Sequence, residues 1–372
     1  DALIDRIEVF PRMKVLDPGV GTGELLRALL DREPSAEASG WDIDPDVLRP
    51  ARQLVPEAEL AERSALEAEE SDSFDLVIAN PPYFQLRLGP QERSRFAQVI
   101  SGRPNIFALF FQVGIRQLRP GGTLAFIVPP SMNSGAYFEA LREYLTDEAE
   151  ITDLTILDGN DLFEGANTAI QLLVLRKHDG RQGEDQSASN FVFRREVPRA
   201  GFRRVVLSPD PSRLAAEFKG RKTLWELGLE ASTGQVIWNE NRSRLHQEPG
   251  PGRVPLVWSH SIPEGEMAAG PDGLGVHKPG KPGFYDSADG GKPALTGPAI
   301  VVNRVVGSVG RGELRAALVP DGVRFIAENH VNVIRPRDDS LEIDWERLLD
   351  SLRRPEVAGR VRLLTGNTQI SA

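Results

Sequence analysis

The first half of the chain alternates short apolar runs with longer stretches in which apolar residues recur at helical spacing. The short runs predict strands at residues 13–16, 38–43, 74–79, 123–128, 151–157 and 168–175. The helical spacing predicts helices at residues 23–32, 106–118 and 137–145. Pro120-Gly121-Gly122 predicts a turn between the second of these helices and the strand that follows it. Strands that alternate with helices favour an α/β fold, in which a mostly parallel sheet carries helices on both faces.

The second half has a different pattern. The stretch 178–190 is polar and rich in Gly, Ser and Gln, which predicts a loop, and 191–207 predicts one or two further strands. From about Ser208 onward Pro and Gly are dense and the predicted strands are short, with one helix expected near Trp345–Arg353. The stretch 272–291 is rich in Gly, Pro and Lys and predicts a long surface loop. Two domains are therefore expected, an α/β domain at 1–207 and a smaller α+β domain at 208–372.

The chain has no cysteine and only five histidines, which narrows the possible chemistry. Disulfides, thiolate metal sites and cysteine nucleophiles are excluded, and with them cytosine C5 methylation, which needs a cysteine to attack the ring. The histidines lack the spacing of metal ligands, so no metal site is predicted. No apolar run reaches the length of a membrane span and no signal-peptide pattern opens the chain, so a cytoplasmic protein is expected. The chain begins at Asp1 rather than Met, so further residues upstream are expected.

The net charge of −10 is unusual for a protein that binds nucleic acid, but the charge is unevenly spread. Residues 1–180 hold 17 Lys and Arg against 30 Asp and Glu, a net of −13. Residues 181–372 hold 27 against 24, a net of +3. The second half is thus weakly basic, which permits DNA binding there and is also compatible with an ordinary solvated surface.

A glycine-rich loop joins the first predicted strand to the first predicted helix, in Asp17-Pro18-Gly19-Val20-Gly21-Thr22-Gly23. Glycines there allow positive φ and a close approach of the backbone to a ligand, and the helix N-terminus favours anionic groups. Asp42 ends the next strand about 20 residues further on, where a carboxylate can accept hydrogen bonds from both ribose hydroxyls. NAD and S-adenosylmethionine both fit, and a plain strand–helix turn without a ligand is the alternative. Asp44 precedes Pro45 and is interpreted as a helix cap.

Asn80-Pro81-Pro82-Tyr83 directly follows a predicted buried strand, so it should lie at the ligand-binding edge of a parallel sheet. An exocyclic amine on adenine or cytosine is a poor nucleophile because its lone pair is delocalised into the ring. Two acceptors that hold its two hydrogens, the Asn80 side-chain oxygen and the Pro81 carbonyl, would free that lone pair to attack a sulfonium methyl group. Proline fixes φ and makes the loop rigid, and Tyr83 offers an aromatic face for the base. Such catalysis works by positioning and electrostatics, without a covalent intermediate.

The order of these motifs resembles the γ-class amino-methyltransferases of bacterial type II restriction–modification systems, which are N6-adenine DNA methyltransferases. The resemblance covers roughly residues 12–178. A less specific resemblance to the recognition domains of the same family covers residues 228–336, through Ser232-Thr233-Gly234, Glu248-Pro249-Gly250-Pro251-Gly252 and Glu328-Asn329-His330. Together the two resemblances imply a Rossmann-like S-adenosylmethionine-dependent methyltransferase domain at 1–207 and a target-recognition domain at 208–372.

The resemblance also implies roles for individual residues. Those expected to bind S-adenosylmethionine are Asp17, Pro18, Gly19, Gly21, Asp42, Ile43, Ser64, Ala65, Asn80 and Phe110. Phe163 matches an aromatic residue that stacks on the flipped target base opposite Tyr83. The chain departs from the family at Ser64, where an acidic residue usually contacts the adenine amine of the cofactor. A family segment that precedes the glycine loop and covers the methionine moiety is also mostly absent, because only residues 1–12 lie there.

Double-stranded DNA is the partner that this resemblance implies, possibly shared with a cognate restriction endonuclease that acts on the same site. Because the target atom lies inside the duplex, the base must be flipped out. Sequence recognition is expected from Arg and Lys side chains of the second half, which can contact guanine edges and phosphates. The candidates are Arg242, Arg244, Lys278, Lys281, Arg304, Arg311 and Arg315, each of which could also be a solvated surface charge.

Several other functions fit part of the sequence. The target could be cytosine N4 instead of adenine N6, or the amide of a protein glutamine, because some protein methyltransferases also use Asn-Pro-Pro-Tyr. An RNA base is a further alternative. A DNA-specificity subunit without catalysis belongs to a different class, and the intact Asn80–Tyr83 motif argues against it. A nicotinamide dehydrogenase would explain the glycines and Asp42 but not Asn-Pro-Pro-Tyr.

Overall fold

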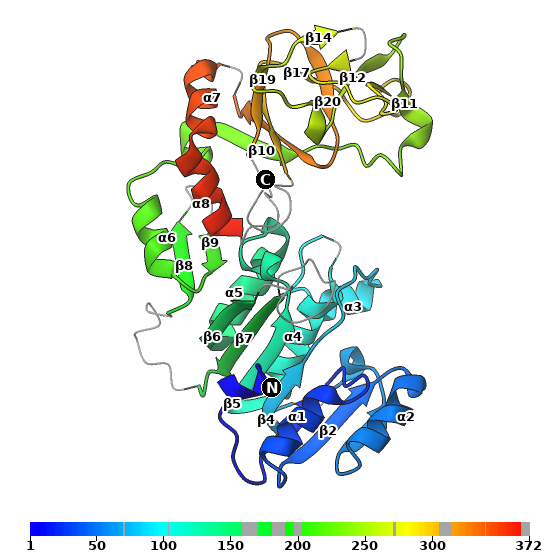
Figure 1. The fold of residues 1–372 in the computed structure, drawn as a ribbon, viewed down its shortest axis with the longest axis vertical. Helices are drawn as coiled ribbons and strands as arrows, with labels where there is room; N and C mark the ends of the chain where they lie inside the picture. Colours follow the sequence, from blue (N-terminus) through cyan, green and yellow to red (C-terminus); the bar gives the residue numbers. More distant parts are fainter. Residues whose placement is uncertain are drawn as a thin grey trace. The chain divides into compact units, whose positions relative to one another are not determined.

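The structure is a computed structural model that describes residues 1–69, 71–102, 104–157, 170–180, 190–196, 203–270, 273–304, 314–338 and 340–365. The chain forms two compact units (Figure 1). Unit 1 comprises Asp1–Arg195 and Arg204–Ala215, and unit 2 comprises Glu196–Arg203 and Ala216–Ala372. Helix α6 (Pro211–Phe218) begins shortly after the boundary predicted at 207.

Unit 1 is built on a seven-stranded sheet in the order β3-β2-β1-β4-β5-β7-β6. Neighbouring strands run parallel except that β7 is antiparallel to both β5 and β6. The predicted mostly parallel sheet is therefore confirmed, and the carboxyl ends of the parallel strands lie along one edge. The strands are β1 (Lys14–Asp17), β2 (Glu37–Asp42), β3 (Glu59–Glu62), β4 (Phe74–Ala79), β5 (Leu118–Val128), β6 (Ala149–Leu157) and β7 (Ile170–Lys177).

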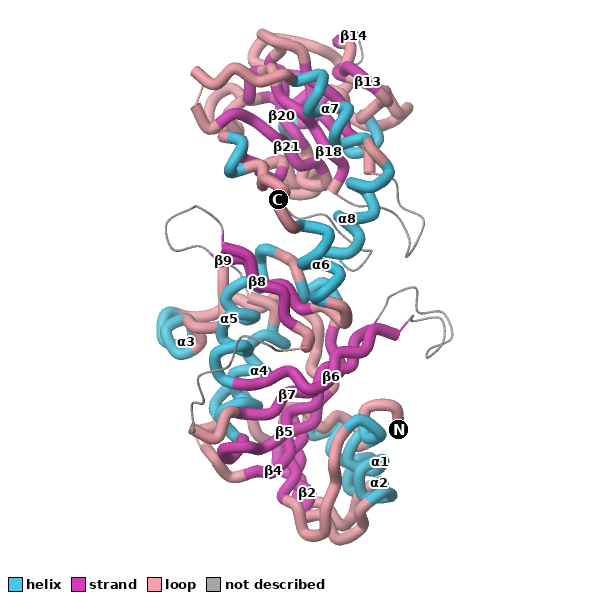
Figure 2. The backbone as a smooth tube through the Cα atoms, turned by 90° about the vertical axis from the view of Figure 1, so that its left-hand side faces the viewer, coloured by secondary structure: helices cyan, strands magenta, loops and turns pink. Residues whose placement is uncertain are grey.

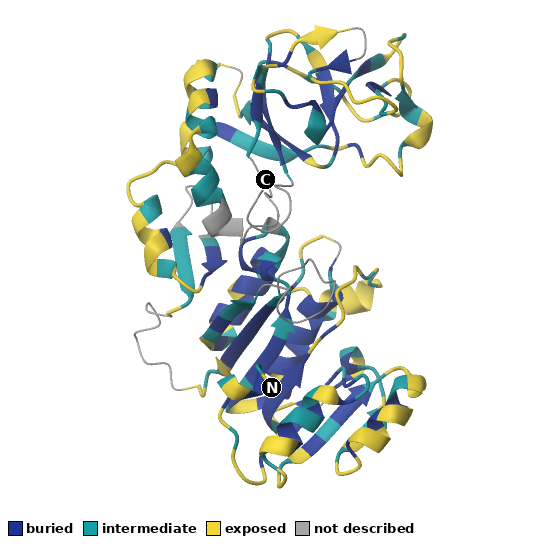
Figure 3. Cartoon of the chain, viewed as in Figure 1, coloured by how far each residue is buried: buried dark blue, intermediate teal, exposed yellow. Residues whose placement is uncertain are grey.

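Helices cover both faces of this sheet, as the side-chain alternation along β4 requires (Figure 2). Leu76 and Ile78 belong to one core cluster, which also contains residues of α1 (Glu24–Arg32) and α2 (Pro45–Leu54). Val77 and Ala79 point the other way, into a cluster with α4 (Ile106–Gln117) and α5 (Glu139–Glu148). Because successive strand residues face opposite sides, the four consecutive apolar residues 76–79 require burial on both faces of the sheet. Figure 3 shows the central strands as buried along their length.

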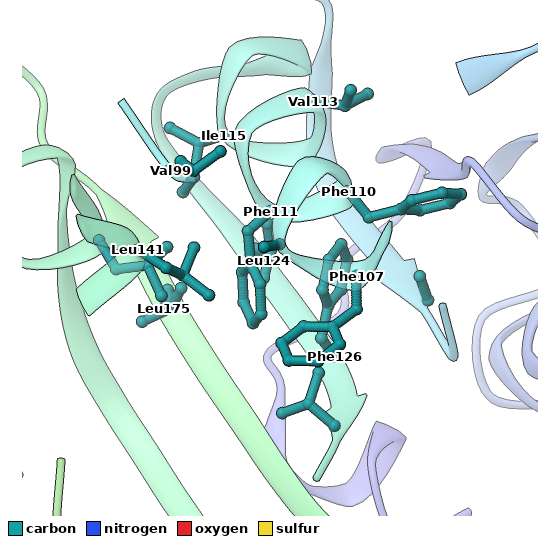
Figure 4. Close-up of a cluster of buried hydrophobic side chains, with 14 of the residues drawn as sticks. Val99, Phe107, Phe110, Phe111, Val113, Ile115, Leu124, Phe126, Leu141 and Leu175 are labelled. Atoms are coloured by element: carbon teal, nitrogen blue, oxygen red, sulfur yellow. The ribbon is translucent and has the colours of Figure 1, made fainter. Parts of the chain in front are cut away.

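Helix α4 is buried almost all round, with only Arg116 exposed at its end. Phe111 of this helix packs against Phe126 of β5, with the ring centroids 4.9 Å apart (Figure 4). Gly114 is the point of closest approach, because a Cβ there would lie 2.6 Å from Leu124 Cδ1. A helix of this kind is a core element rather than an amphipathic surface helix.

Unit 1 differs from the sequence prediction at one turn and in three elements that were not predicted, β3, α2 and α3 (Pro90–Arg95). Pro120-Gly121-Gly122 was expected as a turn before a strand, but it lies inside β5, which starts at Leu118. Gly121 has φ of 76°, and the register with β4 shifts between Phe74 and Leu76, so these residues form an irregularity within the strand. Helix α2 was not predicted as an element. Its expected cap is confirmed, since the Asp44 side chain accepts from Asp46 N at 2.9 Å.

Further elements of the chain are short. They are α3 (Pro90–Arg95), β8 (Val192–Glu196) and β9 (Arg203–Leu207), and β8 and β9 pair with each other. Val205 and Leu207 of β9 belong to the core cluster that covers α4 and α5.

Unit 2 contains two five-stranded sheets, in the orders β10-β21-β18-β19-β13 and β11-β16-β12-β20-β17. Apolar residues from both sheets, including Val301, Val333 and Phe325, form a common core cluster. The strands are β10 (Leu229–Thr233), β11 (Leu245–His246), β12 (Arg253–Val257), β13 (Gly265–Glu266), β14 (Ala269–Gly270), β15 (Gly273–Leu274), β16 (Phe284–Asp286), β17 (Leu295–Thr296), β18 (Ala299–Asn303), β19 (Ala316–Val319), β20 (Arg324–Ala327) and β21 (Val331–Pro336).

Helix α7 (Trp345–Arg353) has the bounds that the sequence predicted. Leu349 of α7 packs with Ile300, Val302 and Ile334 on the opposite face of the first sheet from Val301. The sequence did not predict α8 (Pro355–Thr365). The expectation of a continuous surface loop at 272–291 was wrong, because β16 crosses it and Tyr285 is only 1% exposed.

Candidate active site

Three polar side chains singled out in the sequence follow neighbouring strands of the unit 1 sheet. Asp17 ends β1, Asp42 ends β2 and Asn80 follows β4, and β1 lies between the other two strands. All three strands are parallel, so these residues lie at the same edge of the sheet. Adjacent strands are about 4.8 Å apart, which brings the three loops into one site.

The glycine-rich loop is tied to the acids on either side of it. Gly19 N donates to Asp17 Oδ1 at 3.0 Å, and Gly21 N donates to Asp42 Oδ2 at 3.0 Å. Gly21 has φ of 51°, and no atom lies within 4 Å of the position that a Cβ would take. The loop therefore holds a conformation that favours glycine and leaves open space beside it, as a ligand-binding loop requires.

Asp42 retains the capacity to bind a ribose. Its Oδ1 accepts from Asp44 N at 3.0 Å and its Oδ2 accepts from Gly21 N. Each carboxylate oxygen has two lone pairs, so one acceptor position per oxygen remains for a hydroxyl group. Ile43 beside it is 71% exposed and offers an apolar surface for an adenine ring. The donor set thus fits the adenosine part of a cofactor.

Phe110 lies against the glycine loop rather than in the middle of the aromatic cluster of α4. A Cβ on Gly19 would lie 3.1 Å from Phe110 Cε1. In Figure 4 its side chain points away from Phe111 and Phe126. The ring therefore forms one wall of the loop, the place where a cofactor ring would lie.

Ser64 and Ala65 follow β3, next to Asp42. Arg63 N donates to Asp42 O at 2.9 Å, which fixes the start of this segment at the end of β2. The guanidinium of Arg63 lies 4.3 Å from the ring centroid of Trp41. Ser64 is half-buried and Ala65 is buried. The segment that holds Ser64 and Ala65 therefore begins beside the end of β2, next to Asp42.

Tyr83 is joined to Asn80 by a hydrogen-bond arrangement that the sequence did not predict. Its hydroxyl lies 2.8 Å from Asn80 Oδ1 and 2.8 Å from Ile127 O of β5. One hydroxyl proton can be donated to only one of these acceptors at a time. Burial raises the pKa of the Tyr83 hydroxyl to about 12, so it stays a neutral donor at physiological pH. The interaction depends on β5 being the neighbour of β4, for which the sequence holds no local signal.

The Tyr83 ring remains available although its hydroxyl is held. It is 46% exposed, and it meets Phe107 edge-on with the centroids 6.2 Å apart. Asn80 and Pro82 are exposed, while Pro81 is buried. Phe163, the predicted partner of Tyr83 across the base, lies outside the described residues.

The cations predicted to contact DNA lie in unit 2 and fall into two groups. The guanidinium groups of Arg244, Arg304 and Arg315 donate to backbone carbonyl oxygens, at 2.8 Å to Ala288, 3.2 Å to Asn329 and 3.2 Å to Ser259. Arg242 and Lys278 are exposed and Lys281 is half-buried, and Arg311 lies outside the described residues. Among the residues that the structure describes, no group of three metal-ligating side chains occurs, and no helix is long and apolar enough to cross a membrane.

Asp17 gives a stability prediction. Burial raises the pKa of its carboxyl to about 7, far above the ordinary value of 3.8, with the charges of Asp42 and Glu24 acting in the same direction. The pKa of this carboxyl is higher in the folded than in the unfolded protein. The free energy of unfolding is therefore highest below pH 3.8, where both states are protonated, and it falls as the pH rises to about 7. Asp17→Asn keeps an acceptor for Gly19 N and carries no charge. From about pH 5 to about pH 8 we expect wild type to lose about 3 kcal/mol more stability than this variant.

Urea unfolding of the two proteins at both pH values measures this difference. Asp31→Asn is the control, because Asp31 is exposed. An identical pH dependence in wild type and Asp17→Asn would show that the buried carboxyl does not titrate in this range.

Known proteins match both the motif region and the whole chain. The family model described as Eco57I restriction-modification methylase matches residues 42–163. The type II methyltransferase M.CvrRI of Paramecium bursaria Chlorella virus XZ-6E is 24% identical over 357 residues, which cover 95% of this chain and 85% of that protein. Four further matches are one modification methylase and three type II methyltransferases, and the chain spans 42% to 61% of their length.

Two other matches concern only part of the chain. The release factor glutamine methyltransferase of Caulobacter vibrioides is 32% identical over 143 residues, or 34% of this chain and 50% of that protein. Among solved structures, the M protein of the type I restriction enzyme EcoKI is 19% identical with a TM-score of 0.38, covering 47% of this chain and 41% of that one.

The match with M.CvrRI extends over nearly the whole chain. The residues that the family model matches include Asn80-Pro81-Pro82-Tyr83. By sequence the chain is thus similar to type II methyltransferases and to the Eco57I restriction-modification methylases. S-adenosylmethionine is the cofactor that fits its glycine loop, Asp42 and Ile43.

Proposed function

We propose that this protein is a site-specific DNA methyltransferase that transfers a methyl group to adenine N6 of a flipped-out base. It would act as the modification enzyme of a restriction–modification system, on sites shared with a cognate endonuclease. Unit 1 carries the chemistry and unit 2 recognises the target. The observation that carries the proposal is the exposed Asn80 side chain directly after β4, beside the glycine loop that follows β1.

The cofactor supplies an electrophilic methyl group on a sulfonium sulfur. Asn80 Oδ1 accepts one hydrogen of the target amine, and the Pro81 carbonyl accepts the other. This holds the nitrogen lone pair out of conjugation with the ring. The acceptors act on charge that develops as the nitrogen attacks, which is the form of electrostatic catalysis that lowers a barrier most.

Tyr83 has two parts in this arrangement. When its hydroxyl donates to Asn80 Oδ1 rather than to Ile127 O, it fixes the orientation of the Asn80 amide group. The second lone pair of that oxygen remains for the amine. Its exposed ring stacks on the flipped base, and such stacking contributes about 1–3 kcal/mol per base.

Mass spectrometry of nucleosides tests the proposal. Plasmid DNA is incubated with the purified protein and S-adenosylmethionine, then digested. We expect N6-methyladenine. N4-methylcytosine would keep the Asn80 mechanism but change the target base. Unmodified DNA from a protein that binds the cofactor would refute the proposal and favour a specificity subunit without catalysis.

A protein glutamine amide is the second candidate substrate. The observation in its favour is the 32% identity over 143 residues with a release factor glutamine methyltransferase. A primary amide also presents two hydrogens to Asn80 and Pro81. Unit 2 argues for DNA, since its exposed cations suit phosphates. Methylation of a glutamine peptide but not of plasmid DNA would decide for the protein substrate.

A further inference from the structure

Tryptophan and cationic side chains of unit 2 gather around Lys281. Its Nζ lies 4.9 Å from the ring centroid of Trp258 and 5.4 Å from that of Trp238. The guanidinium carbon of Arg242 lies 5.0 Å from the same Trp238 ring, which is 40% exposed. A cation over an aromatic face is attracted by the negative charge of the ring. The two cations are therefore held in place before any ligand arrives.

A concave pocket adjoins these side chains. Trp258, His260, His277 and Lys281 line it together with the backbone of Gly275. The His260 ring stacks on Trp258 with the centroids 6.0 Å apart, and Trp258 Nε1 donates to Pro282 O at 2.7 Å. Gly275 has φ of 79°, and a Cβ there would lie 2.1 Å from Ser261 O. The pocket wall is thus built tightly from ordered residues.

Burial lowers the pKa of His260, and the nearby Lys278, Lys281, His277 and Arg315 lower it further. A neutral imidazole offers one donor and one acceptor, which suits the edge of a base. In a chain of net charge −10, this local concentration of cations calls for an anionic partner.

We infer that one surface of unit 2, which we call the Lys281 surface, docks on duplex DNA. The Lys281 surface consists of Trp238, Arg242, Trp258, His260, His277, Lys278 and Lys281. Arg242, Lys278 and Lys281 contact phosphates, and the half-buried His260 contacts a base edge. The inference rests on the proposed function and adds which side chains bind phosphates and which one selects the base. The guanidinium groups of Arg244, Arg304 and Arg315 already bind protein carbonyls and support the fold instead.

The test measures binding of a fluorescently labelled duplex to the full-length protein at several salt concentrations. Each phosphate contact contributes about 0.9 to the slope of log affinity against log salt. We expect Lys281→Gln and Arg242→Gln each to lower that slope by about 0.9 and to weaken binding about eightfold near 0.1 M salt.

Two matched controls separate docking from folding. Lys222→Gln removes an exposed lysine of the same unit outside the Lys281 surface. Arg337→Gln removes an arginine that lies 3.7 Å over Trp225, another cation–tryptophan pair. Both controls should bind like wild type, and Lys281→Gln should unfold at the same temperature as Lys222→Gln.

His260→Ala tests whether His260 selects the DNA sequence. The slope of log affinity against log salt should be the same for this variant as for wild type. Discrimination between a duplex with the methylated sequence and a scrambled duplex should fall about tenfold. If wild type binds DNA and the Lys281, Arg242 and His260 variants behave like the controls, the Lys281 surface is not the docking site. If wild type neither binds nor methylates DNA, the proposed function itself fails.

Discussion

Asn80→Leu is expected to slow methyl transfer about 10²–10³-fold while S-adenosylmethionine still binds. Leucine has nearly the shape of asparagine and lacks an acceptor, so the amine hydrogen that Asn80 Oδ1 would take is left without a partner. Removing one preorganised hydrogen-bonding group from a catalytic site costs about 10²–10³-fold in rate. The Tyr83 hydroxyl can still donate to Ile127 O, so the loop keeps its tether to β5.

Asn80→Asp is the matched control, because a carboxylate keeps an acceptor oxygen at the same place. We expect it to retain much more activity than Asn80→Leu. Single-turnover transfer rates and equilibrium cofactor binding measure the two effects separately. Full activity of Asn80→Leu would remove the acceptor mechanism, and loss of cofactor binding would assign Asn80 to the cofactor instead.

Arg142→Met is expected to destabilise unit 1 by about 3–5 kcal/mol, because the substitution leaves buried acceptors without a donor. Arg142 is fully buried in α5. Its guanidinium donates to Val205 O at 2.6 Å, to Met132 O at 2.8 Å and to Gly135 O at 2.7 Å. Burial lowers its pKa to about 10, so it stays charged at neutral pH.

The same guanidinium lies 3.4 Å from Glu139 Oε2, which also binds Arg204 at 2.7 Å. Arg142 therefore joins α5 to β9 and to the segment that follows β5. Arg116→Met is the control, since Arg116 is exposed at the end of α4 and its loss should change stability by less than about 0.5 kcal/mol. Urea unfolding measures both. Equal stability of the two variants would mean that water replaces the lost donor.

Local sequence determined most of the strands and the edge of the sheet at which the candidate site residues lie. The predicted strand at Phe74–Ala79 has those bounds, because its consecutive apolar residues 76–79 can be satisfied only inside a sheet covered on both faces. Asp17, Asp42 and Asn80 could be assigned to one edge because parallel strands place their carboxyl ends together. The Asp44 cap could be read from its own side chain, since capping is a contact within a few residues.

Contacts between residues far apart in the chain were decided only by the tertiary structure. The Tyr83 hydroxyl meets Ile127 O because β5 is the neighbour of β4, and Phe110 of α4 meets Gly19 of the loop after β1. Arg142 was not singled out in the sequence because its three carbonyl partners carry no side-chain signal. In the sequence Lys281 is one of several candidate cations, and only the tertiary structure shows that its Nζ lies over the rings of Trp238 and Trp258. A sequence pattern fixes which face of an element is buried, whereas the pairing of elements depends on packing over the whole domain.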